Sequence, residues 1–338
     1  MQKGQERFDY FLRELETLLT QASRQKNPAL YLYRQPTRTH LFMLEGLCRC
    51  YGSMHNSKRF DRLRHEFKLL EDALGAIDYY DDIAKKTKDL TKIPAAVKQY
   101  MQAMTREKIQ HFNDLLEQGQ WIGHRPKKLK KIREKLETAD RSDEREEMEG
   151  IRNYYLRSIG SIHEFLKKSG PDFNDMEHDV HEFRRKIRWL SIYPHALRGA
   201  IQFGKADKVR AHLKKYMTPE TRESRFNVFP GPGENRYLLL LDKTSFLSLS
   251  WLIAELGRLK DSGLMVVGIQ EALNQGASSG DEIYALKKTY DMLGKNQVPL
   301  PVLLKKSAEI CHRFSEEQVL DSLVQGVEKS EKKKMAVK

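Results

Sequence analysis

Cysteine is scarce in this chain and follows no pairing pattern. The 338 residues include three cysteines, Cys48, Cys50 and Cys311, with no CxxC pair among them. An odd, unpatterned set of cysteines argues against a disulfide framework and against a cysteine-based zinc site. We therefore expect small buried hydrophobic residues at Cys48 and Cys50 and a reducing cytoplasm as the compartment.

Long hydrophobic runs are also missing. The most apolar stretch, residues 238–256, contains Asp242, Lys243 and Glu255, whereas a transmembrane helix needs roughly 18–20 apolar residues. The first residues, MQKGQERFDYFLRELETLL, form an amphipathic and partly acidic pattern, which is not typical of a signal or transit peptide. We predict a soluble protein that does not insert into a membrane.

Short catalytic signatures are absent as well. The sequence has no Walker loop, HExxH, CxxC pair or G-x-S-x-G, which are motifs of nucleotide hydrolysis, metalloproteolysis, redox chemistry and serine catalysis. His178 and His181, with Glu177 and Glu182 beside them, could hold a metal, but the neighbouring arginines oppose a cation. We predict a protein that is not an enzyme and carries no metal or cofactor.

Positive charge is in excess. The 60 lysines and arginines outnumber the 47 aspartates and glutamates, which gives a formal net charge of +13 at pH 7 and a sequence pI near 9.4. Such an excess favours a polyanionic partner, such as nucleic acid, an anionic membrane surface or polyphosphate. The composition, 39% hydrophobic and 32% charged, is typical of a globular chain. The length predicts two domains or one large duplicated unit.

Apolar residues recur at helical spacing through most of the chain, and no segment shows convincing strand alternation. We therefore predict an all-α fold. The helix over 39–54 is apolar almost all round, with Arg38, Glu45 and Arg49 on its narrow polar edge, which indicates a central, buried helix. A long helix over 58–88 is interrupted at Leu74-Gly75. The other predicted helices cover 5–25, 94–118, 127–137, 140–168, 178–198, 205–217, 237–261, 282–293 and 300–327, and an irregular loop covers 227–235.

The segment over 178–198, HDVHEFRRKIRWLSIYPHALR, sorts into two opposite helix faces. One face is apolar, with Phe183, Ile187 and Leu190, and it predicts a core contact. The opposite face gathers imidazole and guanidinium groups that all lie within about 60° of His181. Its residues are His178, His181, Arg184, Arg185 and Arg188.

This cationic stripe places like charges one helical turn apart. Arg184 and Arg188 are four residues apart, and such pairs cost a helix roughly 0.2–0.5 kcal/mol each. Glu182 points to the side, and only Glu177 approaches the stripe. An anion supplied from elsewhere would explain the arrangement, and an ordinary solvated basic face is the alternative.

A local phrase occurs twice in the chain. DALGAIDYYDD at 72–82 and AELGRLKDSGL at 254–264 each place Leu-Gly near the end of a long helix, with an acid soon after. Each also follows a helix that bears a histidine, His40 or His181. The repetition predicts two related helical halves, over 1–168 and 169–328, followed by a basic, disordered tail over 329–338.

Two motifs resemble those of the conserved-histidine α-helical domain, usually called CHAD. The first is a histidine followed by arginines three and seven residues later, which here are His181, Arg184 and Arg188. The second is Leu-Gly-x-x-basic-Asp, which is similar to LGRLKD at 256–261. The chain departs from the family pattern at Trp189 and Ser191, where the family tends to have further arginines. In the first half, Met43 and Leu47 follow His40 in place of arginines, and Asp78-Tyr79 replaces the basic-Asp pair.

The resemblance implies two pseudo-symmetric four-helix bundles in one CHAD-like unit, with an extra N-terminal helix and a basic channel between the bundles. Members of that family bind inorganic polyphosphate, and some are found at polyphosphate granules. They are often fused to a triphosphate-hydrolysing domain, but no ExExK signature of that domain occurs here. The resemblance therefore implies a stand-alone, cytoplasmic, non-enzymatic module for polyphosphate or a similar polyanion.

The predicted binding residues are cations from both halves. His181, Arg184, Arg185 and Arg188 are the first candidates, with His178 and Lys260 in support. Further candidates are Arg38, His40, Arg49, Lys58 and Arg62 in the first half and Lys205, Lys208, Lys214 and Lys215 in the second.

Two other functions fit the same sequence. Nucleic-acid binding is the main alternative, because the basic helices over 127–137 and 205–217 could follow a phosphate backbone. These helices lack interleaved exposed aromatic residues for base stacking. A structural or scaffold role for the helical bundle is the other alternative.

Overall fold

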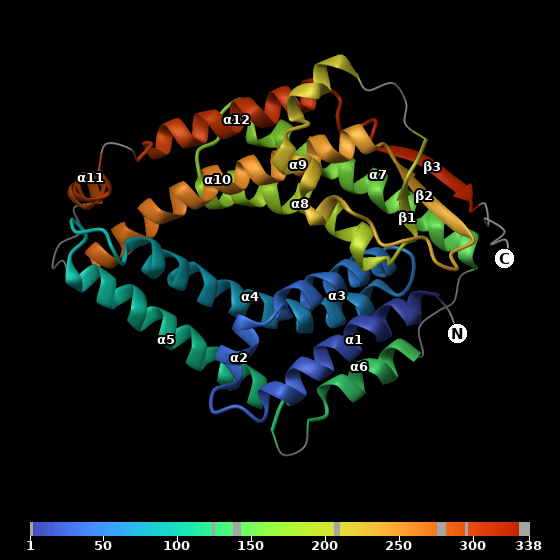
Figure 1. Cartoon of the computed structure of the whole chain (residues 1–338), viewed down its shortest axis with the longest axis horizontal. Helices are drawn as coiled ribbons and strands as arrows, with labels where there is room; N and C mark the ends of the chain where they lie inside the picture. Colours follow the sequence, from blue (N-terminus) through green and yellow to red (C-terminus); the bar gives the residue numbers. More distant parts are fainter. Residues whose placement is uncertain are drawn as a thin grey trace.

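The computed structural model describes residues 3–123, 126–137, 143–205, 210–275, 282–294 and 297–330. The chain is mainly helical, as predicted, and its helices form two layers (Figure 1). The lower layer in that view holds the helices of the N-terminal half. These are α1 (Lys3–Ala22), α2 (Pro28–Arg34), α3 (Thr37–Gly52), α4 (Ser57–Thr87), α5 (Ala95–Gln118) and α6 (Lys128–Glu137).

The upper layer contains the remaining elements. It begins with α7 (Glu144–Ser169), the π-helix η1 (Met176–His181) and α8 (Glu182–Ala196), and its longest helix is α10 (Lys243–Asn274). The smaller elements are β1 (Ile201–Phe203), the 3-10 helix η2 (Ala211–Tyr216), α9 (Pro219–Glu223), the 3-10 helix η3 (Arg225–Asn227), β2 (Tyr237–Leu241), α11 (Glu282–Leu293), α12 (Leu300–Glu316) and β3 (Val324–Lys329).

Side-chain caps explain where several helices begin. Asn27 and Asn56 cap α2 and α4 by accepting hydrogen bonds from the backbone N–H of Leu30 and Arg59, which satisfies donors that have no partner within the helix. Asp143 caps α7 in the same way. The first turn of α7 carries three glutamates, whose charges favour the N-terminal end of a helix.

The long helix α4 runs through the predicted interruption at Leu74-Gly75. Leu74 is buried, and its neighbours Leu70 and Ile77 continue the same apolar stripe. A glycine in the middle of a helix costs roughly 1 kcal/mol, which packing along the rest of the 31-residue helix offsets. The predicted interruption is therefore wrong, and α4 is continuous through Leu74-Gly75.

A small three-stranded sheet was not predicted. β1 pairs in parallel with β2, and β2 pairs antiparallel with β3. The predicted helix over 237–261 therefore begins as the strand Tyr237–Leu241. The side chain of Asp242 accepts a hydrogen bond from the backbone N–H of Ser245, and α10 begins there. The predicted helix over 205–217 is reduced, among the described residues, to the 3-10 helix η2.

One continuous hydrophobic core extends through both layers. It includes Leu44 and Leu47 of α3, Ile187 and Leu190 of α8, and residues of α1, α4, α7, α10 and α12. α3 packs against α8, so the two layers meet along these helices. α7, which the sequence assigns to the first half, packs against α8, β2 and β3 in the upper layer. A second, smaller cluster joins α4, α5, α10 and α11 at the far end.

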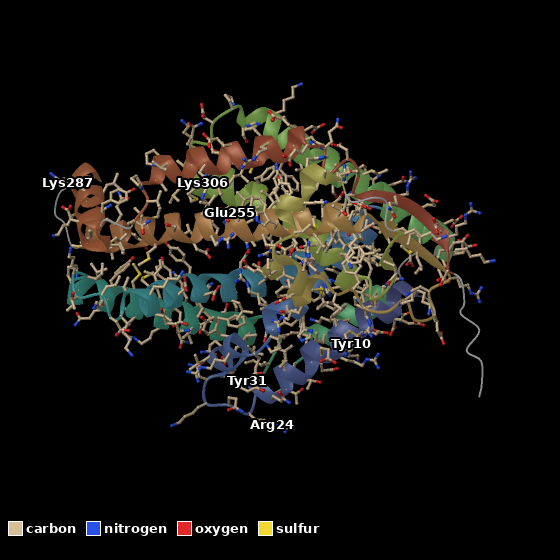
Figure 2. All side chains as sticks on the ribbon, turned by 45° about the horizontal axis from the view of Figure 1, so that its top comes forward. Tyr10, Arg24, Tyr31, Glu255, Lys287 and Lys306 are labelled. Atoms are coloured by element: carbon tan, nitrogen blue, oxygen red, sulfur yellow. The ribbon has the colours of Figure 1, made fainter. Side chains whose placement is uncertain are left out.

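Polar contacts link neighbouring helices at the surface. In the upper layer, Glu255 of α10 and Lys306 of α12 form an ion pair at 3.5 Å (Figure 2). In the lower layer, Tyr31 of α2 donates a hydrogen bond to Gln21 of α1 at 2.6 Å. Among the described residues, no helix has the length and apolar composition needed to cross a membrane.

Candidate anion-binding cleft

A cleft with a volume of about 720 Å³ lies between the two layers. Residues of α3 and α4 line one side, and residues of η1, α8 and α10 line the other. We call it the interlayer cleft. Its basic residues are Arg38, Arg49, Lys68, Lys86, His181, Arg184, Arg185, Arg188 and Lys260, and its acidic residues are Glu45, Glu71, Asp72, Asp78, Asp82, Glu177 and Asp261.

Arg184 is held at the cleft by the backbone of α10. Its Nε donates a hydrogen bond to the carbonyl oxygen of Ile253 at 3.0 Å. A Cβ atom at Gly257 would lie 3.1 Å from Nη2 of Arg184, so this glycine leaves room for the guanidinium. Burial lowers the pKa of Arg184, Asp261 opposes that effect, and the charge of Arg38 adds to it. Leu-Gly in the second half therefore positions the first arginine of the motif.

Arg38 takes the same place in the first half. A Cβ atom at Gly75 would lie 2.9 Å from Nη2 of Arg38. Unlike Arg184, Arg38 is neutralised by carboxylates, because Nε binds Glu71 at 2.7 Å and Nη1 binds Asp78 at 3.1 Å. The repeated Leu-Gly phrase thus accommodates an arginine of the neighbouring helix in each half.

This equivalence corrects the predicted pairing of the two halves. The prediction matched His40 with His181 and therefore Met43 with Arg184, but it is Arg38 that lies beside the glycine as Arg184 does. In the matching register, Gln35 corresponds to His181 and Phe42 to Arg188. The first half therefore keeps one of the three motif residues.

Arg188 lies against the ring of Phe42, the residue that corresponds to it in the first half. Its guanidinium carbon is 4.2 Å from the centre of the Phe42 ring, a cation–π contact. Burial lowers the pKa of Arg188 to about 10, and the charges of Arg184 and Arg38 contribute to the shift. Among the described residues, neither Arg184 nor Arg188 has a carboxylate oxygen within 4.0 Å.

Arg49 and Glu45 lie one turn apart on α3 and line the same cleft. The guanidinium carbon of Arg49 lies 4.2 Å from the ring of Trp189 on α8. Its Nη2 is 3.9 Å from Oε2 of Glu45, which is too long for a hydrogen bond. Burial raises the pKa of Glu45 to about 7, and the charge of Glu71 adds to that effect.

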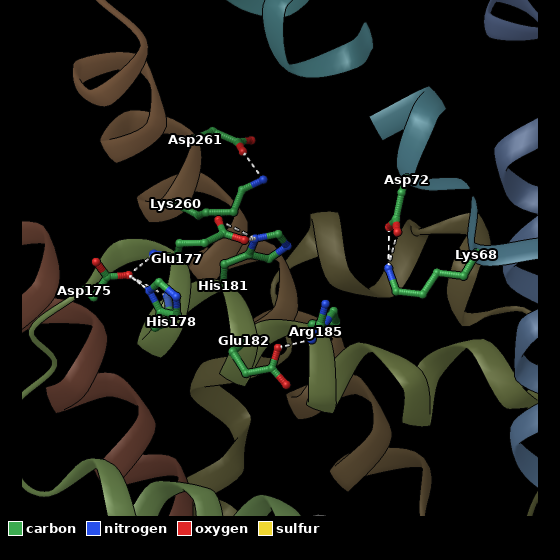
Figure 3. Close-up of polar contacts among 10 residues, drawn as sticks. All are labelled: Lys68, Asp72, Asp175, Glu177, His178, His181, Glu182, Arg185, Lys260 and Asp261. Carbon is green, nitrogen blue, oxygen red and sulfur yellow. Dashed lines mark hydrogen bonds and ion pairs between the residues drawn. The ribbon is translucent and has the colours of Figure 1, made fainter. Parts of the chain in front are cut away.

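His181 points into the cleft and is held by an acid of its own segment. Its Nδ1 is 2.8 Å from both carboxylate oxygens of Glu177 (Figure 3). Hydrogen bonding to His181 lowers the pKa of Glu177, and burial opposes it. Lys260 also lines the cleft and forms an ion pair at 2.9 Å with Asp261, which follows it in the chain.

His178 does not line the cleft, contrary to the prediction. It lies on the π-helix η1, which has a wider turn than the α-helix used to place it on the stripe. Its ring bonds to Asp175 at 2.9 Å, and 86% of the side chain is exposed. Arg185 does line the cleft, but its guanidinium forms an ion pair with Glu182, which the sequence placed to one side.

Three first-half candidates lie outside the cleft lining. His40 packs near Phe11 of α1, with ring centres 6.4 Å apart, and its Nδ1 has no hydrogen-bond partner. Burial lowers the pKa of His40, and Glu14 opposes the effect. Lys58 and Arg62 are exposed on the first turns of α4, away from the lining residues.

The described residues of the proposed extension along 205–215 do not line the cleft either. Lys205, Lys214 and Lys215 are exposed, and Lys215 pairs with Glu317. Lys208 lies outside the described residues. η2 packs against α10.

The fold brings acids of α4 to the cleft, although few acids lie on the cationic stripe of α8 itself. α4 presents Glu71, Asp72, Asp78 and Asp82 to the cleft, and these side chains pair with cations of α3 or α4. Two of those cations, Lys68 and Lys86, line the cleft and were not predicted. Each stands four residues from its acid, a helical ion-pair spacing that was visible in the sequence.

Among the described residues, no three His, Cys, Asp or Glu side chains gather closely enough to hold a metal ion. Comparisons of the chain with protein-family models, with curated proteins and with solved structures find no match.

Proposed function

We propose that the interlayer cleft binds a phosphate-rich polyanion, with inorganic polyphosphate as the candidate ligand and with no chemical conversion of it. One observation carries this proposal. Arg184 and Arg188 lie one helical turn apart in the cleft, and neither has a carboxylate partner among the described residues. Two neighbouring, partly desolvated cations with no carboxylate in direct contact favour an anion from solution.

Phosphate suits these side chains. A guanidinium offers planar N–H donors that match two phosphate oxygens, and charge-assisted hydrogen bonds of this kind are the strong ones. Polyphosphate carries about one charge per phosphate unit, so its binding would also release counterions, as it does for nucleic-acid backbones.

The proposal does not depend on the net charge of the cleft. Its eight lysines and arginines are nearly balanced by its seven acids. The arrangement matters more, because most of those acids already pair with other cations, whereas Arg184 and Arg188 remain unpaired among the described residues. A short anionic segment seated at these arginines would complete the charge pairing.

The two halves fit the same proposal. We propose that they are related helical bundles, because Arg38 with Gly75 and Arg184 with Gly257 form equivalent contacts on either side of the cleft. The CHAD-like arrangement of two four-helix bundles, the cytoplasmic location and an association with polyphosphate granules are parts of this proposal. A stand-alone binding module is its simplest form.

Nucleic-acid binding has weaker support. The basic helix α6 uses Lys128 and Arg133 in ion pairs with Glu66 and Glu16. Lys215 of η2 is paired with Glu317. A cleft of about 720 Å³ falls in the size range of small-ligand sites, and so it suits a thin single chain rather than a duplex.

Competition binding tests the proposal. Long-chain polyphosphate should displace both duplex DNA and single-stranded RNA at matched charge concentration and at two salt concentrations. Polyphosphate should remain the tightest-binding of the three polymers at the higher salt concentration, because the arginines bind the phosphate groups directly and do not act only by long-range attraction. Tighter binding of either nucleic acid at matched charge would overturn the polyphosphate assignment.

A variant separates binding from folding. Arg188→Ala should lower polyphosphate affinity about tenfold or more, the effect of losing a charge-assisted hydrogen bond. Its melting temperature should stay the same or rise, because Arg188 is a desolvated cation without a carboxylate partner. Arg157→Ala, at an exposed arginine of α7, is the charge-matched control and should leave affinity unchanged. A large loss of stability in Arg188→Ala would show that this arginine is structural.

A further inference from the structure

Glu45 is a buried acid at the interlayer cleft whose hydrogen-bonding capacity is unused. Its relative exposure is 2%, and its Oε1 has no hydrogen-bond partner. A buried carboxylate oxygen without a partner costs free energy, so such atoms need an explanation. Glu45 lines the cleft, so a ligand in the cleft could supply the partner.

Arg49 presents a matching donor beside it. Its Nε is also buried without a hydrogen-bond partner. The two side chains do not satisfy each other, since the nearest pair, Nη2 and Oε2, is 3.9 Å apart. The contact of the guanidinium with the ring of Trp189 keeps Arg49 in this position. One unused donor and one unused acceptor thus belong to neighbouring residues of the cleft lining.

We infer that Glu45 and Arg49 form a subsite for a phosphoryl group that carries a proton near neutral pH, such as the terminal group of a linear phosphate chain. This inference rests on the proposed function and specifies which part of the ligand the cleft recognises. Nε of Arg49 donates to a phosphoryl oxygen. Glu45 shares one proton with a second oxygen of the same group.

The chemistry of phosphate chains makes this a selective arrangement. Interior phosphate groups are strong acids, so they hold no proton near neutrality and accept one poorly. A terminal group or free phosphate is more basic. An ionised Glu45 repels a fully deprotonated oxygen, but a shared proton turns this repulsion into a hydrogen bond. The subsite therefore favours chain ends over chain interiors.

The surroundings of Glu45 support proton sharing. Burial raises the pKa of its carboxyl group to about 7, which places proton exchange in the neutral range. Arg49 and Lys68 oppose this rise, and Glu71 and Asp72 add to it. Arg188 of α8 also lies within electrostatic range. Among several guanidinium groups a bound phosphate would lose its own proton, so the buried acid is what retains it.

Calorimetric titration tests the inference with three probes: linear tripolyphosphate, cyclic trimetaphosphate and orthophosphate. Titrations at pH 8 in two buffers of different ionisation enthalpy give the number of protons taken up. We expect wild-type protein to take up about one proton with tripolyphosphate and clearly less with the cyclic compound, which has no terminal group. Orthophosphate separates recognition of a free phosphate from recognition of a chain end.

Two variants with the same charge change complete the test. Glu45→Gln should lose the proton uptake, and its preference for linear over cyclic ligand should fall about tenfold. Glu134→Gln removes an exposed acid of α6 that pairs with Lys130 and lies outside the cleft lining, and it should keep both properties. Similar behaviour of the two variants would overturn the inference, as would equal proton uptake by wild-type protein with linear and cyclic ligands. Wild-type protein that binds none of the three probes and no long-chain polyphosphate would instead overturn the proposed function.

Discussion

Arg184 and Arg38 differ in their neighbours more than in their positions. Both guanidinium groups rest beside a helical glycine, but Arg38 binds Glu71 and Asp78 whereas Arg184 binds a backbone carbonyl. A carboxylate partner neutralises an arginine, and a carbonyl partner leaves it charged. The second half therefore holds the more available cation, although the two halves place their arginines alike.

The titration of Glu45 gives a prediction about stability at the same scale. Its pKa is about 7 in the folded protein, above its ordinary value of 4.5. The folded state therefore binds this proton more tightly than the unfolded chain. The contribution of Glu45 to the free energy of unfolding should decline as pH rises from about 4.5 through about 7.

Glu45→Gln removes this decline. The gain in unfolding free energy of the variant over wild type should be larger at pH 8 than at pH 5, by up to about 3 kcal/mol. Urea denaturation of both proteins at several pH values measures it. A difference that stays constant with pH would show that Glu45 has an ordinary pKa. Glu134→Gln, at an exposed and paired acid of α6 outside the cleft lining, should show no such trend.

Sequence reasoning found some of the cleft residues and misplaced others. Arg184, Arg185 and Arg188 share a helix face, which a 100° rotation per residue predicts well. His178 was misplaced because it lies in the π-helix η1, whose residues turn by a smaller angle than those of an α-helix, and no periodicity rule indicates a π-helix. Glu71 was missed as a cleft residue, because its place opposite α8 depends on packing between helices far apart in the sequence.

At the scale of elements, the two glycines of the repeated phrase each leave space for an arginine of a neighbouring helix. Gly257→Ala would place a methyl group 3.1 Å from Nη2 of Arg184. Alanine gains about 1 kcal/mol in helix propensity over glycine, but the arginine must move away. We expect polyphosphate affinity to fall severalfold while the melting temperature changes little.

Gly160→Ala on α7 is the matched control for that variant. No atom lies within 4 Å of the methyl group that it would add. It should raise the free energy of unfolding by up to about 1 kcal/mol and leave binding unchanged. Affinity and thermal melts of the three proteins measure both effects. Unchanged binding in Gly257→Ala would show that the position of Arg184 is not critical.

The small sheet shows why element types can be misassigned. Residues 237–241, YLLLL, form an apolar run that fits a buried helix or a short strand equally well. β2 is a strand because β1 and β3 pair with its two edges, and both come from distant parts of the chain. The residues of 237–241 do not indicate which strands pair with them, so the strand could not be predicted from this segment. The long helices could be predicted, because the periodicity of their own apolar residues indicates them.

At the scale of the whole molecule, the cleft belongs to both halves. α3 and α4 contribute one wall, η1, α8 and α10 the other, and a single core continues behind them. The net charge of +13 attracts polyanions to the molecule as a whole. The cleft then limits how much of a chain can be bound closely.

This limit predicts a modest salt dependence. If about four cations contact the ligand, the slope of log K against log salt should be about −3, using the single-strand relation. The slope should stop steepening once the phosphate chain is longer than the cleft. Titrations with chains of increasing length at several salt concentrations measure it. A slope that keeps growing with chain length would indicate binding along exposed lysines such as Lys214 and Lys215.

The stacking of Arg49 on Trp189 has a practical consequence. The chain contains three tryptophans, and Trp189 is the one that lines the interlayer cleft. The centre of its ring lies 4.2 Å from the guanidinium carbon of Arg49, a group that we expect to bind a phosphate in the cleft. The emission of this indole should therefore change when the cleft fills, which gives the protein a built-in optical reporter of occupancy and removes the need for a label.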